Sequence, residues 1–338
     1  MKKEKDIMTN NLLILGAAQV NSALEGKESE IIEIVKDTYV FHNDGKTSLP
    51  HSIFLRFPND DRNRIIGLPA YIGGDFNIAG MKWISSFPGN IEHNIERASA
   101  AIFLNDMQTG RVNAVLEGSI ISAKRTAASA ALAAKHLHTN KNEEAFGLIG
   151  CGRINKEILL FVKNVFPTIK KIFMFDLSED RMDNFISWHK DVDYEFVKCG
   201  SIEEVFQNAK LVSFATTAGV PFIDKIEAMT SEHTVLGISL RDLAPSVIEN
   251  AHNIVDDFEH VCRERTSIHL TYQKLGNGDF VAGNIAEVVN GTVAAREEGK
   301  ASVYSPFGLG VLDLAVSNYI YQSALKDNIG TVVENFLP

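Results

Sequence analysis

The spacing of hydrophobic residues divides the chain into two halves with different patterns. Residues 28–43 place apolar side chains at helical intervals, and residues 122–138 are rich in alanine without glycine or proline, so both segments are predicted helices. Between about residues 50 and 120, short apolar runs alternate with glycine, proline and asparagine, which is typical of a mostly antiparallel sheet. The expected strands are residues 52–57, 65–70, 78–85, 100–105 and 112–116, with a hairpin turn over 105–110.

From residue 145 onward, strand-like and helix-like segments alternate, which predicts a parallel, doubly wound sheet. The expected strands are 145–149, 171–175, 194–197, 211–215 and 235–238, and the expected helices are 156–165, 181–190 and 202–208. A last helix, 312–328, is expected to return to the first half. The sequence therefore predicts an α/β protein with two domains. A Rossmann-type domain spans residues 123–311, and an α+β substrate-binding and dimerisation domain spans 1–122, with 312–338 returning to it.

Composition and charge narrow the classes of function. The 338 residues are 45% hydrophobic and 22% charged, as in an ordinary globular enzyme. The net charge of −10 argues against nucleic-acid binding, because no basic excess exists to neutralise phosphates. The three cysteines are far apart and neither they nor the histidines show metal-ligand spacing, so we expect no metal site and a reducing cytoplasm.

The start of the chain does not have the pattern of a targeting segment. The apolar run at residues 12–18 is short and follows acidic residues, which favours a first strand over a signal peptide. Asn21 or Ser22 is expected to cap the helix that follows. No apolar stretch reaches the roughly 18 residues that a membrane span requires, so no membrane partner is expected.

A glycine-rich turn follows the strand predicted at residues 145–149. Gly150 and Gly152 flank Cys151 between this strand and the next predicted helix. In a dinucleotide-binding loop the first glycine permits the tight turn, and the second lets the pyrophosphate approach the backbone at the helix N-terminus. The third position of the motif, normally glycine or alanine, is Asn155, which is a departure from the pattern.

A carboxylate extends the nucleotide-binding pattern. Asp176 ends the strand predicted at residues 171–175, 24 residues after Gly152. A carboxylate at this place accepts hydrogen bonds from the adenosine ribose and repels a 2′-phosphate, which favours NAD over NADP. The alternative is a plain glycine turn and an aspartate that caps the next helix. The strand–turn–helix context favours the dinucleotide site.

Thr216 and Thr217 follow the strand predicted at residues 211–215. At this place Rossmann enzymes run the chain past the nicotinamide ribose. A plain turn at the end of the strand explains the pair nearly as well, so both interpretations stay open.

Four cations interrupt otherwise apolar segments: Arg56, Lys82, Arg97 and Arg125, the last at the expected start of the alanine-rich helix. For any one of them, a surface cation whose stem covers apolar neighbours is the ordinary interpretation. As a set they are able to bind carboxylates through paired hydrogen bonds. We therefore expect a small anionic substrate.

These residues resemble the ornithine cyclodeaminase/μ-crystallin family. The resemblance follows the order of Arg56, Lys82, the segment 125–128, the glycine loop and Asp242, and it extends over nearly the whole chain. It implies a substrate domain that forms a homodimer, a Rossmann domain, and a reaction at a C–N bond with a nicotinamide cofactor.

The resemblance also implies roles for individual residues. Arg56, Lys82 and Arg125 would hold the substrate α-carboxylate, and Lys82 and Asp242 would be catalytic, with Asp242 as acid and base. Arg97 lies outside the common set and is our candidate for binding a side-chain carboxylate. The residues expected to contact NAD are Thr126, Gly150, Gly152, Arg153, Ile154, Asp176, Thr216, Thr217 and Ser239.

A narrower resemblance is to the branch of the family that forms 2,3-diaminopropionate in siderophore biosynthesis. It depends on residues 71–74, 80–84, 94–99, 255–258 and 262–264. Enzymes of this branch oxidise N-(2-amino-2-carboxyethyl)-L-glutamate with NAD, and water splits the imine into 2-oxoglutarate and L-2,3-diaminopropionate. The departures are Asn155 in the glycine loop and Leu240-Arg241 before Asp242, and both lie near the expected cofactor site.

Two other interpretations stay open. One is an ornithine cyclodeaminase, or a ketimine or alanine dehydrogenase of the same family. The other is a μ-crystallin-like protein that binds NAD(P) and a small ligand without turnover. The set of Lys82, Arg125 and Asp242 speaks for an enzyme. The alternative interpretation of Asp242 is a helix cap before Pro245.

Overall fold

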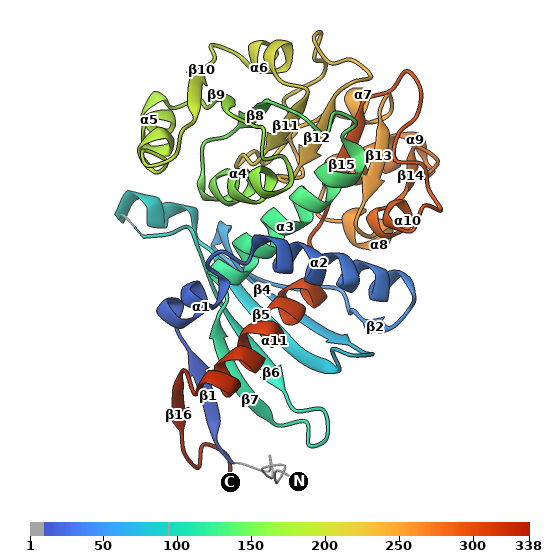
Figure 1. The fold of residues 1–338 in the computed structure, drawn as a ribbon. Coiled ribbons are helices and arrows are strands. Elements are labelled where there is room, and N and C mark those ends of the chain that lie inside the picture. The colour runs from blue at the N-terminus through green and yellow to red at the C-terminus, as the bar shows by residue number, and fades with distance from the viewer. Residues whose placement is uncertain (1–9, 94) are drawn as a thin grey trace. The chain divides into compact units, whose positions relative to one another are not determined.

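The computed structural model describes residues 10–93 and 95–338, and these form two compact units (Figure 1). The first unit holds residues 10–27, 44–122 and 310–338, and the second holds residues 28–43 and 123–309. The first nine residues and Asn94, which the sequence patterns above include, lie outside the described residues.

The first unit is built on one sheet, and its elements occur in the following order. They are β1 (Leu12–Leu15), α1 (Ala17–Leu24), β2 (Thr47–Ser48), β3 (Ile53–Phe57), β4 (Asp60–Ile72), β5 (Ile78–Ser86), the 3-10 helix η1 (Pro88–His93), β6 (Ala98–Asn105), β7 (Val112–Glu117), α11 (Gly310–Asp327) and β16 (Thr331–Val333). The sheet has the order β16-β1-β7-β6-β5-β4-β2, and β3 also pairs with β4. Among the described residues of this sheet, only β1 and β7 pair in parallel, so the expected mostly antiparallel unit is confirmed.

The two faces of this sheet differ. One face packs on α11, whose residues contact β4, β5 and β6; Figure 1 shows this red helix lying along the sheet. The burial of Ala70, Ile102 and Leu104 follows from this cover. On strands β3 and β5, Ile53 and Trp83 are 64% and 38% exposed, since side chains of a strand alternate between faces.

The second unit alternates strands and helices. Its elements are α2 (Glu28–Asn43), α3 (Ser119–Leu137), β8 (Ala145–Ile149), α4 (Arg153–Val165), β9 (Lys171–Phe175), α5 (Glu179–Ser187), β10 (Glu195–Lys198), α6 (Ile202–Asn208), β11 (Leu211–Phe214), β12 (Thr234–Gly237), α7 (Pro245–Ile248), β13 (His252–Val255), α8 (Phe258–Val261), α9 (Ser267–Leu275), β14 (Val281–Asn284), α10 (Ile285–Val289) and β15 (Ser302–Ser305). The strands pair in parallel in the order β10-β9-β8-β11-β12-β15-β13-β14. The predicted Rossmann-type doubly wound sheet is confirmed.

The strand order reverses between β8 and β11. From β8 the chain proceeds to β9 and β10 on one side, and then crosses back to β11 and β12 on the other. The loops after β8 and β11 therefore lie at the point where the strand order reverses, at the carboxyl ends of these strands, and doubly wound sheets bind their ligands at such a point.

The alanine-rich helix α3 is a core helix. Residues 130–134 are fully buried on every side, so its small side chains serve close packing and not merely helix propensity. The helix begins at Ser119, earlier than expected, because the Glu117 carboxylate accepts the N–H groups of Ser119 and Ile120 at 2.7 and 3.0 Å. Arg125 is thus inside the helix, and the expectation that it opens the helix is wrong.

Two other expectations are corrected. Residues 28–43 belong to the second unit instead of the first, because the Tyr39 hydroxyl hydrogen-bonds to Ser129 and Tyr304 at 2.8 and 3.1 Å and α2 packs on α4 and α10. Asn21 and Ser22 lie inside α1, whose N-cap is Gly16.

Candidate functional site

The glycine loop follows β8 at the reversal of strand order. Gly150 has a φ of +88°, and a Cβ there would lie 2.6 Å from the Ala215 carbonyl oxygen. Only glycine tolerates both the left-handed backbone and this close approach of the loop after β11. Gly150 thus allows the loops after β8 and β11 to lie against each other.

Gly152 has a different environment. It is the N-cap residue of α4, no side chain caps this helix, and a Cβ on Gly152 would have no atom within 4 Å. The open space lies beside the first turn of α4, which contains Arg153 and Ile154. A helix start without a side-chain cap, next to open space, suits a phosphate group.

Asn155 explains the departure from the glycine motif. Its side chain is fully buried, and its amide nitrogen donates to the carbonyl oxygens of Ile149 and Gly150 at 3.1 and 2.7 Å. Its amide oxygen accepts from the Ser213 hydroxyl of β11 at 2.8 Å. Asn155 therefore ties α4 to the ends of β8 and β11 by hydrogen bonds, where a third glycine would have done so by close packing.

Asp176 lies directly after β9 and contacts the same loop. Its carboxylate accepts the N–H of Cys151 at 2.8 Å and that of Ser178 at 3.0 Å. Burial, together with the Asp176 charge, raises the pKa of the Cys151 thiol to about 12, so this cysteine stays an unreactive thiol. The carboxylate is held beside the glycine loop, as expected of a group that accepts the ribose hydroxyls.

Asp242 follows β12 at the same edge of the sheet. The carboxyl group is 2% exposed and accepts hydrogen bonds from the hydroxyls of Thr216 and Ser239. Burial raises the pKa of Asp242, and these two hydrogen bonds counteract part of that rise. The helix-cap interpretation fails, because the N-cap of α7 is Ala244.

The backbone before Asp242 is strained. Leu240 has a φ of 73°, which is rare for a bulky residue and is found where the surroundings impose it. The Arg241 guanidinium donates to the Glu264 carbonyl oxygen at 3.0 and 2.6 Å, and the Ser267 N–H donates to the Leu240 carbonyl at 2.8 Å. The unusual Leu240-Arg241 pair therefore anchors the loop that carries Asp242.

In the first unit, Lys82 lies on β5 and is buried against α11. Its ammonium nitrogen lies 2.6 Å from the Asp313 carboxylate and 3.1 Å from the Ser122 hydroxyl. Lys82 and Asp313 are 2% and 0% exposed. Asp313 was not among the residues that the sequence indicated, although a lone acid on a buried helix face is the signal that marks such a partner.

The other cations differ in exposure. Arg56 is exposed on β3, with its guanidinium 5.3 Å from the Phe54 ring centre. Arg97 is partly buried before β6 and donates to the Ser86 hydroxyl at 2.9 Å. In the second unit, Arg125 is buried on α3, beside Thr126.

Arg125 packs against a backbone turn. A Cβ on Gly308 would lie 2.8 Å from the Arg125 guanidinium, and the buried Asp256 carboxylate accepts the N–H groups of Phe307 and Gly308 at 2.9 and 2.7 Å. Burial raises the pKa of Asp256 to about 6. Asp256, also missed in the sequence analysis, thus fixes the turn on which the guanidinium lies.

Each unit by itself brings together one group of the candidate residues. The second unit brings together the glycine loop, Asp176, Thr216, Ser239 and Asp242 at the carboxyl ends of β8, β9, β11 and β12. Thr217 is exposed on the loop after β11 and makes no contact of the same kind. The first unit holds Lys82 and Arg56 on one sheet. Among the described residues, no three potential metal ligands cluster.

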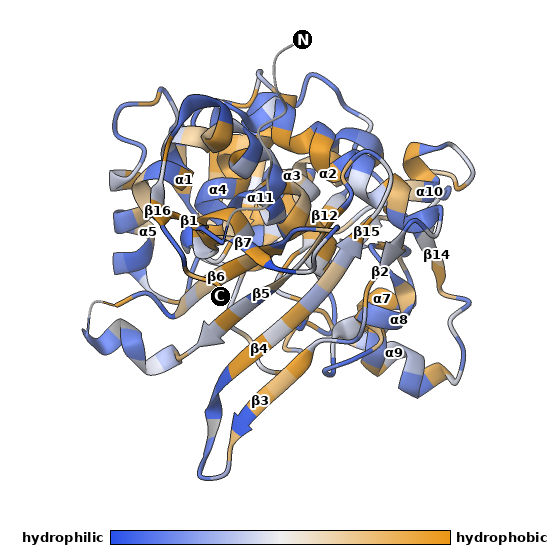
Figure 2. Cartoon of the chain, turned by 90° about the horizontal axis from the view of Figure 1, so that it is seen from below, coloured by the Kyte–Doolittle hydropathy of each residue, from blue (hydrophilic) through white to orange (hydrophobic). Residues whose placement is uncertain are grey.

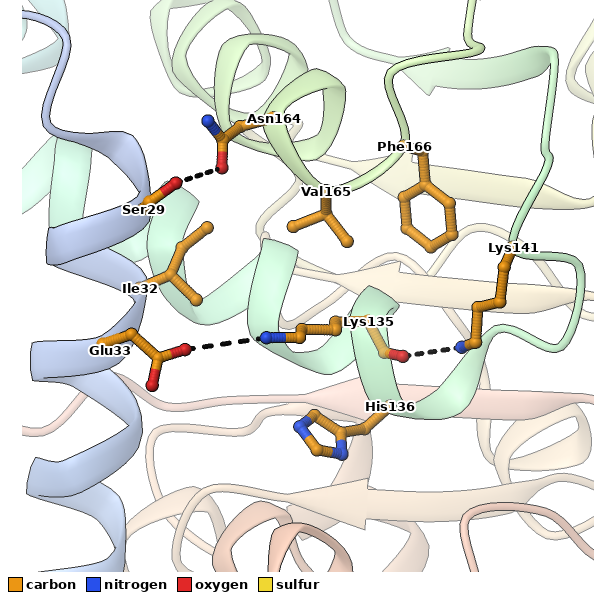
Figure 3. Close-up of a pocket in the computed structure, with 9 residues that line it drawn as sticks. All are labelled: Ser29, Ile32, Glu33, Lys135, His136, Lys141, Asn164, Val165 and Phe166. Carbon is orange, nitrogen blue, oxygen red and sulfur yellow. Dashed lines mark hydrogen bonds and ion pairs between the residues drawn. The ribbon is translucent and has the colours of Figure 1, made fainter.

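A separate hollow in the second unit contains none of these residues. The cavity of about 570 Å³ is lined by α2, α3, α4 and the segments that follow α3 and α4 (Figure 3). Ser29 donates to Asn164 at 3.0 Å, Lys135 pairs with Glu33 at 3.6 Å, and Lys141 donates to the Lys135 carbonyl at 2.7 Å. Four of its polar side chains are paired with one another, and none of the residues of the glycine loop or of the Asp242 cluster lines it, so it is not the candidate site.

We expect alanine to have different effects at Gly150 and at Gly152. Gly150→Ala forces a Cβ against the Ala215 carbonyl and should lower the thermal midpoint by several degrees, because a left-handed residue and a clash cost about 1–3 kcal/mol. Gly152→Ala should leave the midpoint within about a degree and weaken NAD binding at least about tenfold. Differential scanning fluorimetry and titration of NAD distinguish these outcomes. Equal midpoints for the two variants would contradict the assignment.

The comparisons with known proteins agree with this geometry. The model of the ornithine cyclodeaminase/mu-crystallin family matches residues 12–328. The chain is 28% identical over 335 residues to N-((2S)-2-amino-2-carboxyethyl)-L-glutamate dehydrogenase of Staphylococcus aureus, which covers 96% of this chain and 99% of that protein. It is also 28% identical over 331 residues to alanine dehydrogenase of Archaeoglobus fulgidus, with coverage of 96% and 98%.

Solved structures give the same fold. An archaeal alanine dehydrogenase dimer with bound NAD superposes with a TM-score of 0.84 at 26% identity, over 96% of this chain and 99% of that chain. The Delta(1)-pyrroline-2-carboxylate reductase of Thermococcus litoralis, in complex with NADH and L-proline, gives a TM-score of 0.87 at 24% identity, with coverage of 95% and 99%. Since the family model spans nearly all of the described residues, this chain belongs to the ornithine cyclodeaminase/mu-crystallin family.

Proposed function

We propose that this chain oxidises N-(2-amino-2-carboxyethyl)-L-glutamate with NAD. In this reaction the glutamate α-carbon gives up a hydride and the secondary amine a proton, so a C=N bond forms. Water then adds to that carbon and the C–N bond breaks, which yields 2-oxoglutarate and L-2,3-diaminopropionate. The observation that carries the proposal is the buried Asp242 carboxyl, held by Thr216 and Ser239 at the edge of the sheet beside the glycine loop.

The enzyme class follows from the relatives and from the glycine loop, independently of the exact substrate. The chain is an NAD-dependent oxidoreductase that acts on a CH–NH bond, as are its relatives with similar sequences over almost their whole length. The glycine loop, the uncapped start of α4 and the Asp176 carboxylate fit a dinucleotide. When bound, NAD accepts the hydride.

The chain's own residues then perform the remaining tasks. Arg56, Lys82, Arg97 and Arg125 bind the substrate carboxylates. The pKa of Asp242 is raised by burial, which brings its carboxyl closer to the pH at which a general base and acid exchanges protons with water and amine. One Oδ atom of Asp242 takes the proton of the attacking water, and the same carboxyl then gives a proton to the leaving amine.

The NAD contacts follow the geometry of the second unit. We propose that the first turn of α4 with Gly150, Gly152, Arg153 and Ile154 binds the pyrophosphate, and that Asp176 binds the adenosine ribose. Thr126, Thr216, Thr217 and Ser239 are proposed to lie at the nicotinamide end. The Thr216 and Ser239 hydroxyls, which also bind Asp242, then link cofactor position to the acid–base group.

A second candidate activity is that of an amino-acid dehydrogenase for a simpler substrate. The alanine dehydrogenase of Archaeoglobus fulgidus is as similar in identity as the dehydrogenase of Staphylococcus aureus, at 28%. The two activities differ in product, because oxidation of alanine releases ammonia and the proposed reaction releases diaminopropionate.

We propose that the diaminopropionate serves the biosynthesis of a siderophore or an antibiotic. We also propose that the enzyme is cytoplasmic, because its three cysteines are free and disulfides are rare in that compartment.

The test follows NADH at 340 nm with the glutamate conjugate, L-alanine, L-ornithine and L-proline as separate substrates. The proposal expects NADH with the conjugate, together with one equivalent each of 2-oxoglutarate and 2,3-diaminopropionate by mass spectrometry. A cyclodeaminase would convert ornithine to proline without net NADH. Turnover of alanine alone would overturn the proposed substrate but keep the enzyme class.

We also propose that the chain is a homodimer. The sheet face opposite α11 exposes Ile53, Leu55 and Trp83, and Figure 2 shows mostly hydrophobic residues along β3. Exposed apolar side chains gathered on one sheet face are typical of an interface. The similar archaeal alanine dehydrogenase is described as a dimer, which supports a second copy of this chain as the partner.

The dimer is tested by the mass in solution. The unaltered chain should sediment at twice the chain mass of 37.3 kDa, and the double variant Leu55→Glu/Trp83→Glu should sediment as a monomer. Met107→Glu is the matched control, because Met107 is exposed in the turn between β6 and β7. A monomeric parent chain would contradict the proposal.

A further inference from the structure

Two arginines of the first unit lie on adjacent positions of the sheet. Arg64 of β4 pairs with Arg56 of β3 on one side and with Ser86 of β5 on the other. Ser86 in turn pairs with Ala98, the first residue of β6. Directly opposed residues point to the same face about 5 Å apart, so Arg64 and Ser86 are close neighbours.

The paired positions Arg56, Arg64 and Ser86 form a row across β3, β4 and β5. The side chain of Arg97 contacts this row. Its guanidinium donates to the Ser86 hydroxyl at 2.9 Å, and its carbonyl oxygen accepts the Phe87 N–H at 2.8 Å. The Phe87 ring lies 5.9 Å from the Phe57 ring of β3. Arg97 is therefore held at both its backbone and its side chain, which orders the guanidinium before any ligand arrives.

Arg64 and Arg97 lie near each other without an acidic partner among the described residues. In the described part of the chain, no ion pair joins Arg64 or Arg97 to a carboxylate, and the charged group that acts on Arg97 is Arg64. Burial lowers the pKa of Arg97, and the Arg64 charge lowers it further. Two guanidinium groups brought together without an acid repel each other, and an anion between them removes that repulsion.

We propose that Arg64 and Arg97 form a binding site for a second carboxylate of the substrate, distinct from the carboxylate bound near Lys82. The proposal rests on the proposed function, because it deepens the substrate class of the same site. Arg64 was not among the residues that the sequence indicated. Ser86, buried between the two arginines, positions Arg97 and leaves its other N–H groups for the anion.

The separation between Lys82 and Ser86 indicates which class of substrate fits the site. Lys82 and Ser86 lie four residues apart on β5, so their backbones are separated by about 13 Å, and both point to the same face of the sheet. Long side chains from both places are able to hold one small molecule that carries carboxylates several bonds apart. Alanine and proline have one carboxylate each, whereas the glutamate part of the proposed substrate has two. The subsite therefore favours dicarboxylic substrates.

The experiment measures binding of two oxo acids that differ only in the distal carboxylate. Calorimetric titration of the NADH-saturated protein should give a dissociation constant for 2-oxoglutarate at least about tenfold lower than for 2-oxobutyrate. Arg97→Ala and Arg64→Ala should each raise the dissociation constant for 2-oxoglutarate at least about tenfold. Each should change the dissociation constant for 2-oxobutyrate less than about twofold. Arg97→Lys should restore only part of the affinity, because it loses the paired donors.

The matched control is Arg62→Ala, an exposed arginine on the same strand, which should leave both affinities unchanged. Equal weakening of both oxo acids by Arg97→Ala would overturn the subsite, since it would reveal a general structural effect. Failure of the parent chain to bind 2-oxoglutarate would also overturn it. Selective binding of 2-oxoglutarate in a chain that forms no NADH from the conjugate would sustain the subsite and reject the proposed function.

Discussion

Asp242→Asn should reduce turnover at least about a hundredfold, the usual contribution of a positioned general acid and base, while the dissociation constant for NAD changes less than about twofold. An amide keeps the size of the side chain, and it accepts from one of the Thr216 and Ser239 hydroxyls while donating to the other. It cannot take a proton from water. Initial rates at 340 nm and a separate NAD titration measure the two quantities.

The control for this prediction is Asp224→Asn. Asp224 is an exposed carboxylate of the same unit, so its substitution should leave the rate within about twofold. If Asp242→Asn kept the full rate, Asp242 would not be the acid–base group. If NAD binding were lost as well, the carboxylate would be a structural or cofactor-binding group instead.

The pH dependence of the parent chain should agree with the environment of Asp242. Burial raises the pKa of this carboxyl, and a general base acts only when it is deprotonated. The rate should therefore fall as the pH drops through a pKa above the ordinary aspartate value of 3.8. Assays of kcat/KM between pH 4 and 9 would show this acid limb, and a limb at or below the ordinary value would contradict the assignment.

Asp313→Ala should destabilise the first unit strongly. The substitution leaves the Lys82 ammonium buried without its carboxylate, which lies 2.6 Å away in the intact pair, and removal of one partner of a buried ion pair costs about 3–5 kcal/mol. The thermal midpoint should fall by roughly 10 °C. Differential scanning calorimetry measures this change.

Two further variants serve as controls for Asp313→Ala. Asp327→Ala, at the exposed end of the same helix, should change stability by less than about 0.5 kcal/mol. The double variant Lys82→Met/Asp313→Leu should recover most of the midpoint, because apolar replacements of a buried pair are often neutral or stabilising. An unchanged midpoint for Asp313→Ala would mean that the pair contributes little.

The regular elements of both halves were predictable because their signals are local. The alternation of short apolar runs predicted β3, β5 and β7, and the glycine turn between an apolar strand and a helix indicated the loop after β8. The strands β13, β14 and β15 were missed. Each has four residues, and β13 and β15 are buried on both faces, so no alternation distinguishes them.

The residues of the candidate site also differ in whether the sequence indicated them. Gly150 and Asp176 were predicted from the sequence because each of them directly follows a predicted strand. Asp256 and Arg64 were not found, because a capping carboxylate and a strand arginine have no distinctive neighbours along the chain. Their importance arises from the Phe307–Gly308 turn and from the register of β4 with β5.

The sequence by itself thus determined the Rossmann sheet, the glycine loop and the family, since each is encoded by residues within one strand–turn–helix or by a fixed order of motifs. Only the tertiary structure decided that α2 joins the second unit, that Asn155 replaces a glycine by hydrogen bonds, and that Lys82 is paired with Asp313, 231 residues away. The physical reason is that burial, charge pairing and backbone strain depend on which distant segments meet in space, and hydrophobic periodicity does not specify those partners.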